Sequence, residues 1–99
     1  MYARVVTWEG AAADAVRAAT EEIASRAQDG PPEGVPAVGF TLLRDPDAGR
    51  VIAIGLFKTE DDLRAGAAVL NEMTPPGEGM GERASVDVYE VAVDVRLDG

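Results

Sequence analysis

The segment from Ala37 to Lys58 constrains the fold more than any other part of the chain. It holds two apolar runs, Val38–Leu43 and Val51–Phe57, joined by a polar segment that includes Asp-Pro-Asp-Ala-Gly. Both runs are rich in β-branched and aromatic residues, which favour strands. Between them, Pro46 presets the backbone for a turn and Gly49 can adopt a positive φ. The segment is therefore predicted to form a β-hairpin.

Length and charge narrow the class of protein. The 99 residues predict a single domain, 1–99, and 46% hydrophobic with 27% charged residues is typical of a soluble globular protein. The formal net charge of −9 would repel phosphate backbones and anionic membranes, so we expect neither nucleic acid nor membrane as a partner. No signal peptide or membrane-spanning run is apparent, and the expected location is the cytoplasm.

Two residue types are absent. The chain has no Cys, which removes disulfides and thiolate chemistry, and no His, which removes the commonest general base and metal ligand. Acid–base chemistry would therefore fall to residues such as Asp and Glu. The sequence predicts neither a metal site nor a cofactor.

The remaining elements follow from periodicity and stop signals. Tyr2–Trp8 is predicted as a strand buried on both faces, and Gly10–Asp29 as a helix that ends at Gly30. A second helix is predicted to start at the cap Thr59 and to end before Pro75. Its acidic first turn is explained by the helix dipole rather than by a metal.

The last segments are a glycine-rich loop and a long strand. Pro75–Glu82 leaves a helix and opens a strand, the reverse of a phosphate-binding loop, so we expect a connection or a lid over a pocket. Arg83–Leu97 is predicted as a strand that extends past its own sheet, with a bulge near Val88 and Tyr89 as one account of its two alternation patterns. Arg4, inside the first strand, could hold an anion or form an ion pair across the sheet, for example with Asp87 or Glu90, and the ion pair is the expected role.

The order strand, helix, strand, strand, helix, strand is that of an α+β, ferredoxin-like sandwich. It predicts an antiparallel four-stranded sheet with two helices on one face. Because the strands are apolar on both faces, something must cover the second face, and a second copy is the simplest cover. We therefore expect a homodimer that joins through the sheet face and forms a dimeric α+β barrel.

The chain resembles the antibiotic biosynthesis monooxygenase (ABM-type) domains of the dimeric α+β barrel superfamily. The resemblance rests on the element order, on the stretch Gly34–Leu70 with its Asp-Pro hairpin and acidic helix start, and on the closing Val86–Val91. It implies a pocket between sheet and helices. It also implies oxidation of aromatic substrates without bound metal or flavin, in which the deprotonated substrate itself reduces oxygen. A haem-degrading relative would need a ligating His, which this chain lacks.

Candidate site residues were chosen by type and position. The weak catalytic candidates are Trp8, Asn71, Tyr89 and Asp87. The Asn, Trp and Tyr groups of oxygenase relatives are not matched by spacing here. The candidate pocket-lining residues, for most of which simple core packing is the competing interpretation, are Trp8, Phe40, Phe57, Asn71, Met73 and Tyr89.

Two functions remain open at this point. One is a cofactor-independent monooxygenase that acts on a small aromatic or hydrophobic metabolite. The other is a non-catalytic dimeric domain that binds such a molecule or serves as an accessory subunit. A third, an isomerase of the muconolactone type, needs an acid–base pair that the sequence does not identify.

Overall fold

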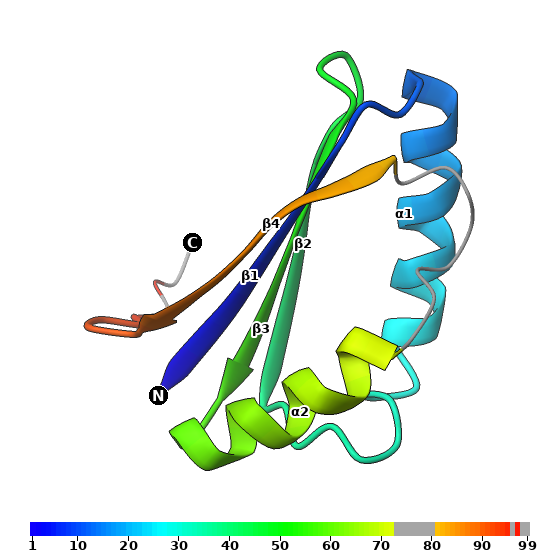
Figure 1. The fold of residues 1–99 in the computed structure, drawn as a ribbon. Coiled ribbons are helices and arrows are strands. Elements are labelled where there is room, and N and C mark those ends of the chain that lie inside the picture. Colours follow the sequence, from blue (N-terminus) through cyan, green and yellow to red (C-terminus); the bar gives the residue numbers. More distant parts are fainter. Residues whose placement is uncertain (73–80, 96, 98–99) are drawn as a thin grey trace.

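The computed structural model describes residues 1–72, 81–95 and 97. The elements are β1 (Tyr2–Glu9), α1 (Ala13–Ala27), β2 (Gly39–Asp45), β3 (Arg50–Phe57), α2 (Glu60–Glu72) and β4 (Glu82–Glu90). All four strands form one antiparallel sheet in the order β2-β3-β1-β4, and both helices lie on the same side of it (Figure 1). The predicted ferredoxin-like fold is confirmed. Most of the glycine-rich loop Pro75–Glu82, including Met80, lies outside the described residues, and so does Met73, which precedes the loop.

The hairpin forms as predicted, with β2 and β3 joined by a short turn. The amide of Ala48 donates to Asp45 Oδ1 over 3.2 Å, and the amide of Gly49 donates to the Pro46 carbonyl over 3.1 Å. Gly49 has a φ of 66°, and a Cβ there would collide with the carbonyl oxygen of Ala11. The turn therefore needs glycine both for its backbone angle and for its close approach to the start of α1.

The helix ends lie near the sequence signals, and the first helix is shorter than predicted at both ends, since it ends at Ala27 rather than at Asp29. Thr59 Oγ1 accepts a hydrogen bond from the amide of Asp62 over 3.1 Å, so Thr59 caps α2 as predicted. The first helix begins at Ala13 rather than at Gly10, because Gly10 has a φ of 91° and cannot belong to a right-handed helix. No helix among the described residues is long and apolar enough to cross a membrane.

Two small apolar clusters join the helices to the sheet. One consists of Val16, Ala19 and Val51, with Trp8 and Leu42 packed against it. The other consists of Val35, Phe57 and Leu63. The sheet residues of both clusters lie on the face that the helices cover, so both clusters lie on one side of the sheet.

The last strand is shorter than predicted. β4 ends at Glu90, and the final link to β1 is the hydrogen bond from the amide of Val91 to the carbonyl of Met1 over 2.8 Å. Among the described residues after Val91, none belongs to a strand. The pairing irregularity lies opposite Thr7 and Trp8, near the start of β4, and not near Val88.

The helix-free face of the sheet stays open to solvent. Register places alternate residues of all four strands on it, and several are apolar and exposed or half-buried. Leu43 is 47% exposed and Tyr89 is 56% exposed. The segment after β4 adds Val93, Val95 and Leu97, which are all exposed. Among the described residues, this face of the sheet is therefore partly apolar and uncovered.

Candidate functional site

The candidate site lies between the sheet and the helices, and β1 provides its floor. Alternation along β1 points Tyr2, Arg4, Val6 and Trp8 toward the helices, and the contacts of Tyr2 and Trp8 with the two core clusters confirm this direction. Val6 is fully buried and Arg4 is only 7% exposed. A strand inside this layer therefore carries a charged side chain, an arrangement that proteins normally offset with a partner.

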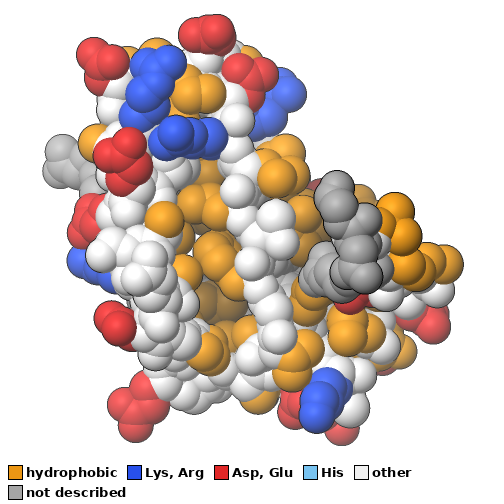
Figure 2. All heavy atoms as spheres, turned by 180° about the vertical axis from the view of Figure 1, so that it is seen from behind, with side chains coloured by type: hydrophobic (Ala, Val, Ile, Leu, Met, Phe, Trp, Pro, Cys, Tyr) orange, Lys and Arg blue, Asp and Glu red, His pale blue; other side chains and the backbone are white. Residues whose placement is uncertain are grey.

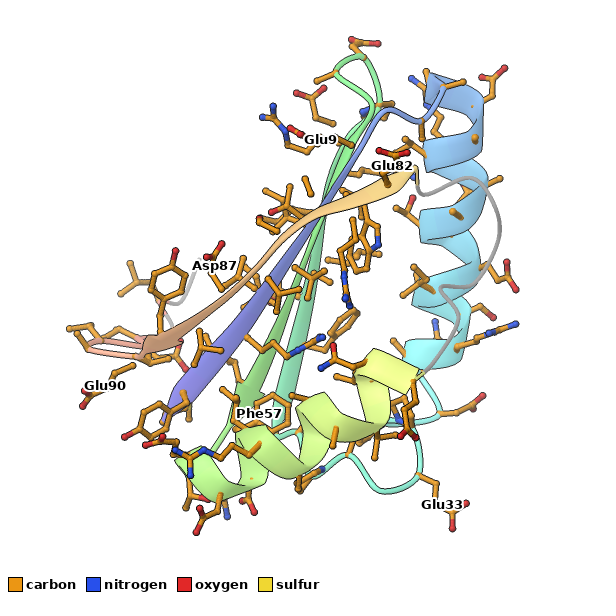
Figure 3. All side chains as sticks on the ribbon, in the orientation of Figure 1. Glu9, Glu33, Phe57, Glu82, Asp87 and Glu90 are labelled. Carbon is orange, nitrogen blue, oxygen red and sulfur yellow. The ribbon has the colours of Figure 1, made fainter. Side chains whose placement is uncertain are left out.

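The partner of Arg4 is Asn71. Arg4 Nη2 donates to Asn71 Oδ1 over 2.9 Å, linking β1 to the last turn of α2. The predicted ion pair with Asp87 or Glu90 is wrong. Asp87 lies on the opposite face of the sheet, because it pairs in register with Val5 rather than with a helix-facing residue. Figure 3 shows the Asp87 side chain projecting from β4 away from α1.

A second arginine reaches the same amide oxygen. Arg83 Nη1, at the start of β4, lies 3.3 Å from Asn71 Oδ1. One neutral oxygen thus accepts from two guanidinium groups. Burial, and to a smaller extent the positive charge of Arg83, lower the pKa of Arg4. Both effects disfavour the charged form of Arg4, and of the two only the positive charge of Arg83 would also favour a negative charge brought to this place.

Two buried donors in the described part of the chain have no hydrogen-bond partner. They are Arg4 Nε and Trp8 Nε1. Both come from the helix-facing side of β1, four positions apart in the sequence. An unpaired buried donor costs about 1–3 kcal/mol, so such groups in a native protein call for an explanation. Oxygen atoms of a ligand in this layer would supply the missing acceptors.

A cavity of about 270 Å³ opens between α1 and β2. Leu42 lines it and also packs against the Val16 cluster that Trp8 contacts. Arg44 Nη1 donates to Thr20 Oγ1 over 2.9 Å at the same place. Figure 2, which shows the molecule from behind, has a hollow lined with hydrophobic side chains on this face. The residues lining the cavity are Thr20, Glu21, Ala24, Leu42 and Arg44.

Sequence reasoning did not select the residues around this cavity, nor Arg83. One signal was available: strand alternation from Leu42 predicts that Arg44 faces the helix. Thr20 follows the apolar stripe of α1 directly, and its hydroxyl also donates to the Val16 carbonyl over 2.8 Å. Its contact with Arg44 depends on how α1 crosses β2, which periodicity does not give.

The sequence-predicted residues fall into separate groups. Trp8 lies in the layer between sheet and helices, and Asn71, which is itself exposed, borders that layer through its hydrogen bond from Arg4. Phe57 is fully buried between β3 and α2, where it fills the core (Figure 3). Phe40 faces the helices by register but is 49% exposed. Tyr89 and Asp87 lie on the other face, so the structure does not bring them together with Trp8, and Met73 is outside the described residues.

No protein-family model matches the chain, and no curated protein matches its sequence. Solved structures do match. MhuD from Mycobacterium tuberculosis, a haem degrader solved with two haems in its active site, superimposes with a TM-score of 0.67 at 20% identity, over 97% of this chain and 100% of that one. An arginine-to-serine mutant of MhuD with two manganese protoporphyrin IX molecules per active site gives a TM-score of 0.58 at 19% identity, over 96% of this chain and 97% of that one. The chain shares the fold of MhuD. At these identities the likeness establishes architecture and not activity, and the ferredoxin-like fold expected from the hairpin and the element order is confirmed at that level.

Proposed function

We propose that the chain is an ABM-like, cofactor-independent monooxygenase whose small aromatic or hydrophobic substrate binds between the sheet and the helices. The observation that carries the proposal is the pair of buried, unpartnered donors, Trp8 Nε1 and Arg4 Nε, in that layer. A substrate oxygen would satisfy a donor there, and the neighbouring apolar side chains would hold the ring system. MhuD, which shares the fold, holds two haems in its active site.

The proposed chemistry needs no external reductant. A carbon that carries two hydrogens next to aromatic rings loses a proton, and the resulting carbanion reduces O₂. One oxygen atom ends in a new C=O group, and the other leaves with the two hydrogens as water. The chain's part is to bind the anion and keep water away from it, with arginine and indole N–H groups facing its oxygen.

The side chains of the described residues do not fit a haem iron. The chain has neither His nor Cys. Of its two tyrosines, Tyr89 lies on the helix-free face and Tyr2 packs against the Val35–Phe57–Leu63 cluster. No group of three His, Cys, Asp or Glu in the described residues is placed to hold a metal ion. No step of the proposed reaction therefore uses haem.

A non-catalytic binding or accessory domain is the second candidate. It is favoured by the position of Asp87, the sequence-based candidate for a base, which lies on the face opposite to Trp8. Of the residues that line the cavity, Glu21 alone carries a carboxylate, and it is exposed. A domain that binds a metabolite without transforming it would need no base at all.

In either case we propose that two copies join through their helix-free sheet faces. The support is the exposed apolar surface that includes Leu43 and Tyr89, together with the segment from Val93 to Leu97. This surface is distinct from the layer that holds Arg4 and Trp8, so assembly and ligand binding would use opposite sides of the sheet.

Oxygen uptake with 1,8-dihydroxyanthrone tests the catalytic proposal. This probe has a doubly activated CH₂ group that becomes a carbonyl with consumption of one O₂. We expect protein-dependent oxygen uptake that survives a metal chelator and falls in Trp8→Phe, which keeps an aromatic ring but lacks the N–H. A rate no higher than the protein-free blank would refute the monooxygenase and leave the binding domain.

A further inference from the structure

We propose that the ligand is an aromatic carboxylate whose anionic group binds between the guanidinium groups of Arg4 and Arg83. The inference rests on the proposed function, because it uses the same layer between sheet and helices, but it adds the charge of the ligand. Three observations support it: the pattern of ion pairs, the geometry at Asn71, and the apolar surface beside the two arginines.

Among the described arginines, Arg4, Arg44 and Arg83 form no ion pair; Arg44 donates to Thr20, whereas Arg4 and Arg83 meet at Asn71. The chain has 18 acidic and nine basic residues, so carboxylates are plentiful. Each of four exposed arginines, Arg17, Arg26, Arg50 and Arg64, pairs with one. In the described part of the chain neither Arg4 nor Arg83 forms such a pair, although Arg4 is only 7% exposed. The most buried arginine is thus left with a neutral partner.

The geometry at Asn71 brings the two charges together. Both guanidinium groups use the single oxygen Asn71 Oδ1, at 2.9 Å from Arg4 and 3.3 Å from Arg83. A neutral amide oxygen cannot offset two positive charges, and Arg4 Nε stays unpaired. A carboxylate has two oxygens and one negative charge, and it matches the planar fork of arginine. Bound beside Asn71, it would lower the repulsion and supply acceptors.

The surface next to the arginines is apolar. Val88 and Val86 of β4 pair in register with Arg4 and Val6 of β1, so they face the helix side of the sheet. Neither α1 nor α2 covers β4, and Val86 and Val88 are 41% and 53% exposed. A ligand that reaches the arginines would lay its body on these valines. Charged and apolar parts side by side favour an aromatic ring that carries a carboxylate.

The test compares 2-naphthoate with 2-naphthamide, which has nearly the same shape but no charge. The chain has one tryptophan, so Trp8 gives the only indole N–H signal in a ¹⁵N-correlated NMR spectrum, and its shift reports binding in this layer. At fixed ionic strength we expect 2-naphthoate to bind at least about tenfold more tightly than 2-naphthamide, which is about 1.4 kcal/mol.

Variants assign the charge preference to its source. Arg83→Gln is expected to weaken 2-naphthoate binding by about threefold to tenfold and Arg4→Gln by about tenfold to a hundredfold, with 2-naphthamide little changed. Arg64→Gln, on the outside of α2, removes the same charge without touching the site and should leave both affinities unchanged. Should Arg4→Gln fail to fold, the exposed Arg83 still decides the question.

Each outcome has a clear meaning. Preference for naphthoate that Arg83→Gln reduces by about threefold or more and Arg64→Gln retains supports the proposal. Equal binding of the two compounds, or equal losses in the two variants, overturns the carboxylate site but leaves a hydrophobic ligand in the same layer. If neither compound moves the Trp8 signal at millimolar concentration, the carboxylate site and the proposed ligand-binding layer both fail.

Discussion

Replacing Gly66 with Ala tests how tightly α2 is packed on the sheet. In an exposed helix this change would stabilise the protein by about 1 kcal/mol. Here a Cβ would lie 2.6 Å from Phe57 Cε1, 3.0 Å from Phe57 Cζ and 3.3 Å from Val35 Cγ1. Carbon atoms in contact normally lie about 3.5–4.0 Å apart, so the ring or the helix must move by about 1 Å.

The Phe57 ring has little room to yield. It is fully buried, and on its other side a Cβ at Gly55 would already lie 3.3 Å from Phe57 Cε2. Overpacking of this kind costs about 1–3 kcal/mol, which exceeds the gain in helix propensity. With the propensity gain subtracted, we expect Gly66→Ala to lower the free energy of unfolding by up to about 2 kcal/mol, and the midpoint of thermal unfolding by up to roughly 16 °C.

Thermal unfolding followed by far-UV circular dichroism, at one fixed protein concentration, measures the effect. The control is Ala68→Gly on the exposed side of α2, which reports the propensity term alone and should destabilise by up to about 1 kcal/mol. A Gly66→Ala protein more stable than the wild type would refute the packing of Phe57 between Gly55 and Gly66.

Three further predictions concern assembly, capping and the turn. Leu43 lies on the helix-free face, so Leu43→Asp should convert a dimer into a folded monomer, measured by light scattering. Leu42 faces the Val16 cluster, so Leu42→Asp should unfold the chain. A monomeric wild type or a dimeric Leu43→Asp protein would contradict the proposed interface. Thr59→Ala should lower the free energy of unfolding by about 1 kcal/mol in denaturant titration, because it removes the acceptor for the Asp62 amide. The exposed Ser25→Ala is the control, and an unchanged midpoint in Thr59→Ala would argue against the cap. Gly49→Ala should lower the free energy of unfolding by at least about 1–2 kcal/mol in the same assay, because Gly49 has a left-handed φ of 66° and the Ala11 backbone leaves no room for a Cβ. No change in stability would show that the turn adopts another conformation.

The parts of the fold that sequence predicted well depend on local chemistry. Asp45, Pro46 and Gly49 specify the hairpin turn within five residues, and Thr59 with Asp62 specifies the start of α2 within four. The extent of the last strand is different. Alternation continues to Leu97, but β4 ends at Glu90, opposite Tyr2 of β1. Strand length is set by the neighbouring strand, and a pattern within one segment does not contain that information.

The candidate site was harder to predict for the same reason. Arg4 and Asn71 are 67 residues apart, and they meet because α2 crosses β1 on the helix-covered side. The sequence suggested acidic residues of the last strand as partners of Arg4. The register of β1 and β4 places Asp87 on the opposite face of the sheet from Arg4. Tyr89 and Trp8 were grouped by residue type, yet register places them on opposite faces. The missing quantity in each case was the face of the sheet on which a side chain lies.

The two faces of the sheet therefore separate two proposals that sequence reasoning had merged. Leu43, Tyr89 and Asp87 lie on the face proposed for assembly, while Trp8 and Arg4 lie on the face proposed for the ligand. If this division holds, Leu43→Asp should change the molecular mass and leave the contacts around the Trp8 indole in place. Arg83→Gln should do the reverse, weakening 2-naphthoate while the mass stays the same. Loss of naphthoate binding in the Leu43→Asp monomer would instead show that the partner copy helps to complete the ligand site.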